Sequence, residues 1–321
     1  MPNFIVGARL HDYGRGTPDE LFGKVSADGF AAVQLAYKKC VPSVKSYADV
    51  TDALVAETVA AEKAHRIQVA VLGTYVELAI NDESRLCNVA DFKSQLAVCK
   101  ALGAGCIGTE TTAMSKQPAG TTRAQAQELL CRSLAEILPA AEALGVTVGI
   151  EPVTYHSMNS AAATRHILDT MRSPNLKVIF DMSNLVSAEN VDAQDRIWYD
   201  MGALLGDQIV AVHFKGQAFA PDGSLLHTSL EESRTDYAGA FAMLRQLPQP
   251  ALPVLREEAV PARAASDIRF MKGIFLMAEF EENTGRGRKR PRRLPHPDGS
   301  RGGLRRNAGA AGALLHQARH L

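Results

Sequence analysis

Short runs rich in Val, Ile, Leu and Ala recur along this 321-residue chain, and each is followed by a longer amphipathic segment. Short apolar runs bounded by turn residues are typical of buried strands, whereas longer segments with one apolar face are typical of helices. This alternation predicts a parallel sheet whose strands are joined by helical crossovers. The eight candidate strands are residues 4–8, 32–35, 68–72, 106–110, 146–151, 177–181, 209–213 and 253–257. The helices expected after them are residues 18–27, 47–65, 83–102, 123–144, 160–171, 193–205, 237–246 and 264–277.

The number of strand-helix units decides between two parallel architectures. Eight units in about 280 residues match the size of a closed (β/α)₈ barrel, whereas a doubly wound open sheet normally has fewer strands in each domain. We therefore expect a single α/β domain, a (β/α)₈ TIM barrel, over residues 1–280, with an open α/β sheet as the alternative. A composition of 46% hydrophobic and 22% charged residues is typical of such a globular domain.

Several expected helix ends carry recognisable signals. Thr17, Pro18 and Glu20 combine an N-cap hydroxyl, a proline at the first helical position and a capping-box carboxylate. Gly103 and Gly145 follow the third and fourth expected helices, where a left-handed residue commonly ends a helix. These signals support helices at the positions that the apolar pattern indicates.

The pattern stops near residue 280. The segment that follows is rich in Gly, Pro, Arg and Ala without a sustained apolar period, which predicts a disordered, basic, low-complexity tail over residues 281–321. Residues 284–321 contain ten Lys or Arg and one Asp, so the residues before them carry 25 basic and 34 acidic side chains. A solvated tail is the simplest interpretation, and an arm that binds RNA or a membrane surface is the alternative. The abrupt change in composition also raises the hypothesis of a shifted reading frame.

The acidic charge of the body argues against a nucleic-acid-binding surface there. The apolar runs are too short to span a membrane, and the N-terminus lacks the basic and apolar regions of a signal peptide. The five cysteines form no Cys-x-x-Cys pair, which favours reduced thiols over disulfides or a zinc finger. We therefore expect a cytoplasmic protein that acts on a small molecule. The apolar faces of the expected helices would also allow two copies of the chain to pair as a homo-oligomer.

Four of the expected strands end in side chains that can bind a metal ion. Glu151, Asp181, His213 and Glu257 end the fifth to eighth strands in turn. Because the carboxyl ends of barrel strands line one mouth, these residues should converge there. Three carboxylates and one imidazole suit one divalent ion such as Mn²⁺, Mg²⁺ or Co²⁺, with Zn²⁺ as a further candidate. Acidic residues also end strands as helix caps, but four successive strands with such an end favour a site.

Four short motifs surround these residues. They are Ile150-Glu151-Pro152-Val153 with His156, Phe180-Asp181-Met182-Ser183-Asn184, Val212-His213-Phe214-Lys215 and Arg256-Glu257-Glu258. In this order they resemble the xylose isomerase-like barrels grouped as sugar phosphate isomerases/epimerases. That family includes ketose 3-epimerases, hydroxypyruvate isomerase and inosose dehydratases, and it is related to endonuclease IV. The resemblance extends from Gly7 to about Phe275.

The resemblance implies one divalent metal ion held by Glu151, Asp181, His213 and Glu257. It also implies an isomerase or epimerase of a small sugar or polyol-derived ketone. A proton next to a carbonyl is too weakly acidic for a free carboxylate, but metal coordination of the substrate oxygens stabilises the enediolate. Glu151 and Glu257 then form the catalytic pair, in which one carboxylate removes the proton and the other returns it. Glu258 is the alternative to Glu257, because adjacent strand residues point to opposite faces.

Polar residues near the strand ends are candidates for substrate binding. Lys215 shares a strand face with His213, and Asn184 follows Asp181 closely. Ketose 3-epimerases usually carry a His and an Arg where this sequence has Asn184 and Phe219, which argues against that activity. The candidate substrate-binding residues are His11, Tyr75, Glu110, His156, Asn184 and Lys215.

Three other functions share parts of this pattern. A lyase that dehydrates an inosose or a sugar acid would begin with the same proton removal. A DNA-repair enzyme of the endonuclease IV kind needs a trinuclear zinc site and a phosphate-binding surface, which an acidic body with six histidines does not favour. A non-enzymatic sugar-binding protein is the remaining alternative. Metal content separates the endonuclease IV-like enzyme from the isomerase, and a turnover screen separates the non-enzymatic protein.

Overall fold

Eight parallel strands form a closed barrel within residues 2–283, the part of the chain that this computed structural model describes. The order of strands around the barrel is β1-β10-β7-β6-β5-β4-β3-β2, and β1 pairs with both β10 and β2. The predicted (β/α)₈ barrel is therefore confirmed, and the open sheet is excluded. The barrel strands are β1 (Asn3–Arg9), β2 (Ala32–Leu35), β3 (Gln68–Gly73), β4 (Cys106–Glu110), β5 (Val148–Glu151), β6 (Leu176–Asp181), β7 (Ile209–Phe214) and β10 (Ala251–Arg256).

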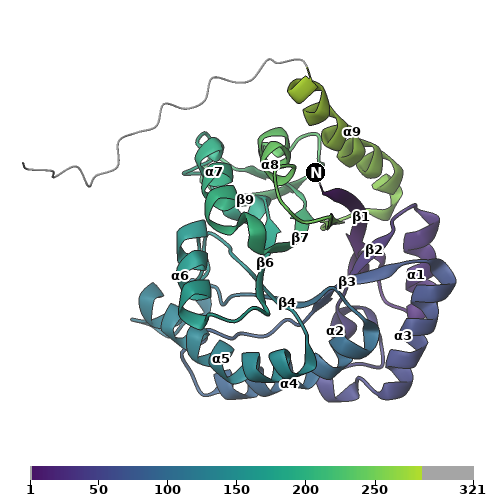
Figure 1. Cartoon of the computed structure of the whole chain (residues 1–321), viewed down its shortest axis with the longest axis vertical. Coiled ribbons are helices and arrows are strands. Elements are labelled where there is room, and N and C mark those ends of the chain that lie inside the picture. The colour runs from purple at the N-terminus through teal and green to yellow at the C-terminus, as the bar shows by residue number, and fades with distance from the viewer. Residues whose placement is uncertain (1, 284–321) are drawn as a thin grey trace, which may run out of the picture.

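Helices surround the strands and cover the outside of the barrel (Figure 1). They are α1 (Pro18–Ala27), α2 (Tyr37–Cys40), α3 (Asp52–His65), α4 (Ser84–Leu102), α5 (Arg123–Leu144), α6 (Ala161–Met171), α7 (Gln194–Leu205), α8 (Tyr237–Leu244) and α9 (Ala264–Asn283). Among residues 2–283, no helix combines the length and the apolar character needed to cross a bilayer. Helix α9 extends past the predicted domain boundary at residue 280. The predicted tail lies outside the described residues from position 284 onward.

The predicted and observed elements differ most before α3. The predicted helix 47–65 is divided into a single 3₁₀ turn, Tyr47–Asp49, and α3. The Asp49 carboxylate accepts a hydrogen bond from the backbone N–H of Ser46, and Thr51 Oγ1 accepts one from Leu54 N. The Asp49 side chain thus closes the 3₁₀ turn, and the Thr51 side chain caps the start of α3. The apolar pattern alone did not reveal these two caps.

The predicted helix-end signals have the expected geometry. Thr17 Oγ1 accepts a hydrogen bond from the N–H of Glu20, and the Glu20 carboxylate accepts one from the N–H of Thr17. Gly103 and Gly145 follow α4 and α5 with φ angles of 65° and 66°. Glycine enters this left-handed region without the steric penalty of a side chain, so both helices end where predicted.

Small residues alternate with a few larger apolar side chains, Val71, Ile179 and Leu255, inside the barrel. A Cβ atom added to Gly108 or Gly149 would lie 2.4 Å or 2.9 Å from side-chain atoms of Ile179, so the two glycines leave room for that side chain. The inner cluster also contains alanines and a cysteine, among them Ala70 and Cys106. Larger apolar residues pack between the strands and the helices. The interior is therefore a packed core, and space for ligands remains only at its ends.

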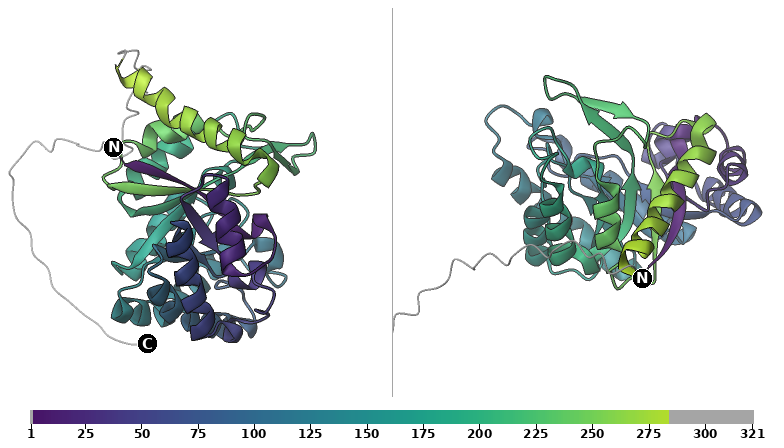
Figure 2. Two further views of the ribbon diagram at one scale, coloured as in Figure 1. Left: turned by 90° about the vertical axis from the view of Figure 1, so that its right-hand side faces the viewer. Right: turned by 90° about the horizontal axis from the view of Figure 1, so that it is seen from above.

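A hairpin that the strand pattern did not predict follows β7. It consists of β8 (Gly216–Phe219) and β9 (Leu225–Thr228), which pair in antiparallel fashion. Figure 2 shows it projecting away from the barrel. Its turn contains Asp222, which accepts a hydrogen bond from Ser224 N, and Gly223 at a φ of 82°. The Asp-Gly pair was the one local signal for this turn.

A buried ion pair ties the end of β10 to α9. Arg256 Nε lies 2.8 Å from Asp267 Oδ2, and the two side chains are 2% and 1% exposed. The Arg256 guanidinium also donates to the backbone carbonyl of Glu257. Since Glu257 is the residue directly after β10, this pair holds a candidate catalytic residue in place.

We expect Asp267→Ala to lower the free energy of unfolding by about 3–5 kcal/mol, because it leaves the Arg256 charge buried without its partner. Asp169→Ala, which removes a solvent-exposed partner of Arg165 in α6, is the control and should change stability by about 0.5 kcal/mol or less. Urea unfolding followed by circular dichroism measures both. Equal effects of the two variants would contradict a stabilising role for the buried pair.

Candidate metal centre and active site

The four predicted ligands converge at the carboxyl ends of neighbouring strands. Glu151 and Asp181 are the last residues of β5 and β6, His213 lies in β7, and Glu257 follows β10. Asp181 and His213 are paired across β6 and β7. Exposure of the four residues is between 0% and 4%. Strand ends thus carry charged groups into a site that is shielded from solvent.

His213 lies between two of the carboxylates. Its Nδ1 atom is 3.0 Å from Glu151 Oε2 and 3.4 Å from Glu257 Oε1. Ligand atoms of Glu151, Asp181 and His213 all lie within 4.8 Å of one another, and this is the one group of such residues found among positions 2–283 that can hold a metal ion. A single group does not match the trinuclear site of an endonuclease IV-like enzyme.

The chemistry of these atoms fits a divalent cation. Nε2 of His213 is buried and has no hydrogen-bond partner among the described residues, whereas His213 Nδ1 and Asp181 Oδ2 have charged neighbours in Glu151 and Lys215. Buried polar atoms are normally satisfied, so an unsatisfied nitrogen beside these carboxylates suggests a ligand. Two carboxylates and an imidazole form a donor set that Mg²⁺, Mn²⁺, Co²⁺ and Zn²⁺ all accept.

Lys215 supplies positive charge beside these carboxylates. Its Nζ atom lies 2.9 Å from Asp181 Oδ2 and 3.8 Å from Glu257 Oε2, and the residue is 7% exposed. Burial alone would lower the pKa of Lys215, but Asp181 and Glu257 outweigh burial and raise it. Lys215 is therefore charged, and its ammonium group points at the oxygens that would otherwise repel each other.

The protonation of His213 depends on the same carboxylates. Burial disfavours the imidazolium, but Glu257 and Glu151 overcome this effect and raise the pKa of His213 to about 9. Glu257 responds in the opposite direction: burial would raise its pKa, whereas His213, Lys215 and Arg9 together hold it below the ordinary value. The metal-free site is thus a network of alternating charges.

The structure places Glu257, and not Glu258, beside His213. Glu258 has a φ of 53° and turns its side chain toward Arg9, whose guanidinium lies 2.9 Å from Glu258 Oε1. Arg9 also binds Asp12 at 2.7 Å, and Asp12 accepts a hydrogen bond from Ala259 N. This network at the end of β1 fixes the turn after β10, and Glu257 faces the barrel axis as the strand parity suggested.

A small cavity lies at the carboxyl ends of the strands, above Ile179. Of the predicted substrate-binding residues, Tyr75 and Glu110 line it together with Glu151, His213 and Glu257. Burial, and next the charge of Glu151, raise the pKa of Glu110 to about 7.

None of the other four predicted substrate-binding residues lines this cavity, but each contacts a residue of the site. Asn184 donates a hydrogen bond to Glu151 Oε1, and Lys215 contacts Asp181 as described above. His156 Nε2 lies 3.8 Å from Glu110 Oε2. The His11 ring packs edge-on against Tyr75 at 5.9 Å. His11 and His156 thus contact Tyr75 and Glu110, two residues that line the cavity.

Two residues of the site were not predicted. Gln34 is 5% exposed, lines the cavity and donates a hydrogen bond to the Tyr75 hydroxyl. Arg9 lies 3.8 Å from Glu257. A glutamine inside the apolar strand 32–35 was a detectable signal, because a buried polar residue needs a partner. Arg9 had no such signal, because the partners that connect it to the site, Glu257 and Glu258, lie almost the whole barrel away in sequence.

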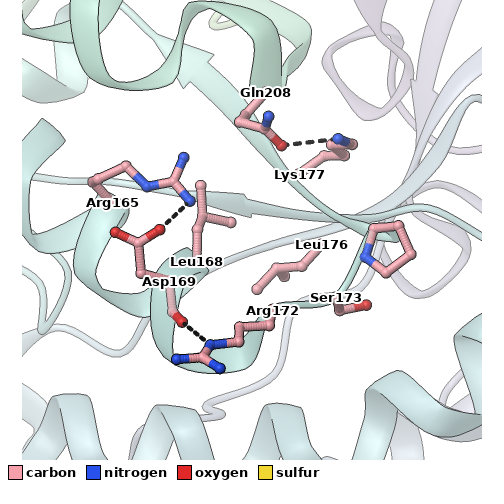
Figure 3. A pocket seen from close by; sticks show the side chains of 9 residues that line it. Arg165, Leu168, Asp169, Arg172, Ser173, Leu176, Lys177 and Gln208 are labelled. Carbon is pink, nitrogen blue, oxygen red and sulfur yellow. Dashed lines mark hydrogen bonds and ion pairs between the residues drawn. The ribbon is translucent and has the colours of Figure 1, made fainter.

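A second hollow, at the amino ends of β6 and β7, has a different character (Figure 3). Its polar groups bind one another: Arg165 pairs with Asp169, and Lys177 donates to Gln208. In this fold the active site forms at the other end of the strands. The hollow in Figure 3 is therefore not a candidate active site.

Comparison with protein families agrees with this geometry. A model of the xylose isomerase-like TIM barrels matches residues 22–274. The chain belongs to this family. The resemblance that the strand-end motifs suggested is thereby confirmed. No curated protein sequence matches the chain.

Solved structures share the fold of this family member at low sequence identity. A D-tagatose 3-epimerase-like protein has a TM-score of 0.69 and 12% identity, over 88% of this chain and 100% of that chain. An L-ribulose 3-epimerase has a TM-score of 0.66 and 16% identity, over 91% of this chain and 100% of that chain. A xylose isomerase-like TIM barrel protein from Mycobacterium smegmatis, in complex with magnesium, has a TM-score of 0.62 and 13% identity, over 85% and 97% of the two chains.

We expect Asp181→Ala and His213→Ala to weaken divalent metal binding by about tenfold or more, because each removes a buried ligand atom. Secondary structure should be preserved, since a site at the mouth of a barrel does not determine its fold. The matched control is His166→Ala, at an exposed position of α6. Isothermal titration with Mn²⁺ measures the affinities. Unchanged stoichiometry and affinity in both site variants would refute the ligand assignment.

Metal binding should also release a proton. His213, with its pKa raised to about 9, is protonated in the metal-free protein at neutral pH and must lose that proton to bind a cation. We expect affinity for Mn²⁺ to rise about tenfold per pH unit below that pKa, since one proton is displaced per ion. Titration in buffers of different ionisation enthalpy counts the protons. An affinity independent of pH would show that His213 is not a ligand.

Proposed function

We propose that this protein is a divalent-metal-dependent isomerase or epimerase of a small sugar or polyol-derived ketone. The observation that carries the proposal is the pair of buried carboxylates, Glu151 and Glu257, which both lie within 3.4 Å of His213 Nδ1. Solved structures of the same fold include enzymes named as sugar 3-epimerases, and one related barrel was solved with magnesium. The five unpaired cysteines agree with a cytoplasmic location.

Glu151, Asp181, His213 and Glu257 are the residues that would hold the ion in this proposal. When bound, a divalent cation offsets the negative charge that develops on substrate oxygens during proton removal. Asn184 holds Glu151 through its side-chain amide. Lys215 points its ammonium group into the same site and can donate to a substrate oxygen.

The two carboxylates have the properties of a proton-transfer pair. Lys215 and Arg9 both lie 3.8 Å from the Glu257 carboxylate and favour its ionised form, and an ionised carboxylate is the form that can accept a proton. Glu151 approaches His213 from β5, whereas Glu257 approaches from the turn after β10. Both carboxylates are at most 4% exposed, so bulk water does not surround them during proton transfer. Gln34, Tyr75 and Glu110 offer hydrogen-bonding groups for the sugar hydroxyls.

A dehydratase is the second candidate, and Glu110 favours it. An acid with a pKa of about 7 can protonate a departing hydroxyl group at neutral pH. Proton removal by Glu151 or Glu257 would then be followed by loss of water instead of proton return. Mass spectrometry of the product distinguishes the two outcomes directly.

We expect Glu151→Gln and Glu257→Gln to retain metal binding and to reduce turnover by a factor of about 10² or more, the usual contribution of general acid–base catalysis. The amide keeps an oxygen donor but cannot carry the proton. Glu258→Gln is the matched control, because Glu258 pairs with Arg9 away from His213, and it should stay within about threefold of the wild type.

The assay is a panel of ketoses, inososes and hydroxyacids incubated with Mn²⁺ in deuterated water and read by NMR. The wild type should incorporate deuterium at the carbon next to the carbonyl. Full activity of both Gln variants on a confirmed substrate would refute the mechanism. If Glu258→Gln is the inactive variant and Glu257→Gln is active, the catalytic residue is Glu258.

A further inference from the structure

A hollow of about 540 Å³ lies at the mouth of the barrel, next to the metal centre. Its walls come from the loop after β5, the loop after β6 and the hairpin β8–β9. These loops also carry Glu151 and Asp181 at their starts. The hollow is thus on the same face of the barrel as the proposed active site.

Asn184 forms the boundary between this hollow and the metal centre. It lines the hollow, and its side-chain amide donates to Glu151 Oε1. Tyr155 lines the hollow from the other loop and packs edge-on against His156, which in turn lies 3.8 Å from Glu110. A substrate whose reacting carbon lies at Glu151 would therefore extend into the hollow past Asn184.

The walls are held in place without a ligand. Gln217 in β8 is 2% exposed, and its amide donates to the carbonyl oxygens of Ser183 and Val186 at 2.7 Å and 3.2 Å. Asn190 donates to the carbonyl of Leu185 and fixes the loop after β6. The hairpin and this loop thus form one rigid surface, as expected of a pre-formed binding site.

The chemistry of the lining selects for a neutral ring. Among the described residues that line the hollow there is no Lys, Arg or His, and Glu189 is the only charged side chain. The rest combine the apolar groups of Tyr155, Phe219 and Leu225 with amides and hydroxyls such as Asn159. Apolar faces with a few placed polar groups suit a hydroxylated ring, whereas a phosphate would require cationic or convergent N–H donors.

We propose that this hollow is a subsite for a second, uncharged sugar ring attached to the reacting one. The substrate is then a glycoside or disaccharide with a carbonyl on the reacting ring, rather than a free or phosphorylated monosaccharide. This inference rests on the proposed function for the reaction itself, but the subsite is defined by residues that take no part in proton transfer.

Binding tests the subsite separately from catalysis. The full-length protein with Mn²⁺ is titrated with fructose, fructose 6-phosphate and the glucosyl-fructoses turanose, leucrose and isomaltulose. At least one disaccharide should bind about tenfold more tightly than fructose, because a second ring adds contacts in a pre-formed pocket. If no disaccharide binds more tightly than fructose, or if the phosphate binds most tightly, the subsite proposal is wrong.

Neighbouring leucines of β9 provide matched variants. Leu225 lines the hollow and is 42% exposed, whereas Leu226 is 46% exposed and does not line it. Leu225→Ala, alone and combined with Phe219→Ala, should remove the preference for the disaccharide and leave the affinity for fructose within about twofold. Leu226→Ala should change neither. The proposal is overturned if the double variant keeps its preference for the disaccharide. It is also overturned if the double variant changes its oligomeric state and keeps that preference.

Deuterium exchange on the same panel distinguishes the two proposals. Exchange with fructose as fast as with every disaccharide would contradict the subsite and leave the proposed reaction standing. Tight binding of a disaccharide, sensitive to Leu225→Ala but without exchange at any carbon, would support the subsite and contradict the isomerase.

Discussion

Three carboxylates share one buried corner of this barrel, and their mutual repulsion has to be balanced by positive charge. Glu151, Asp181 and Glu257 are each at most 4% exposed, so water cannot stabilise them. His213 and Lys215 lie between them and provide that charge in the metal-free protein. A divalent cation bound to His213 can supply the positive charge that the His213 proton supplies in the metal-free protein. The need for this balance explains the strong pKa shifts of His213, Lys215 and Glu257.

The barrel makes such a concentration of charge possible. Parallel strands bring residues that are distant in sequence to the same end, and the core below them is filled by Val71, Ile179, Leu255 and small side chains. Contacts outside the cavity hold the turn that carries Glu257: Arg256 and Asp267 fix its start, and Arg9 fixes its continuation. Stability and chemistry are thus assigned to different residues, which leaves the loops and the hairpin free to define specificity.

Local patterns predicted the fold well, whereas contacts between distant segments were harder to foresee. Strands β2 and β4 and helices α1 and α5 have the predicted bounds, because apolar period, caps and turn glycines are encoded within a few residues. The strand-end residues of the site were found for the same reason. Arg9 was missed because its partner Glu258 is remote in sequence. The hairpin was missed because β8 and β9 are short and one of them is exposed, so neither shows a clear apolar alternation.

The central claim is that these strand ends form one divalent-metal site. Crystals of the protein grown with Mn²⁺, measured at the manganese absorption edge, test it most directly, because anomalous scattering locates the ion without assumptions about the mechanism. We predict one anomalous peak per chain, within bonding distance of Glu151, Asp181 and His213. A peak that none of these side chains contacts, or the absence of any peak at saturating Mn²⁺, would contradict it.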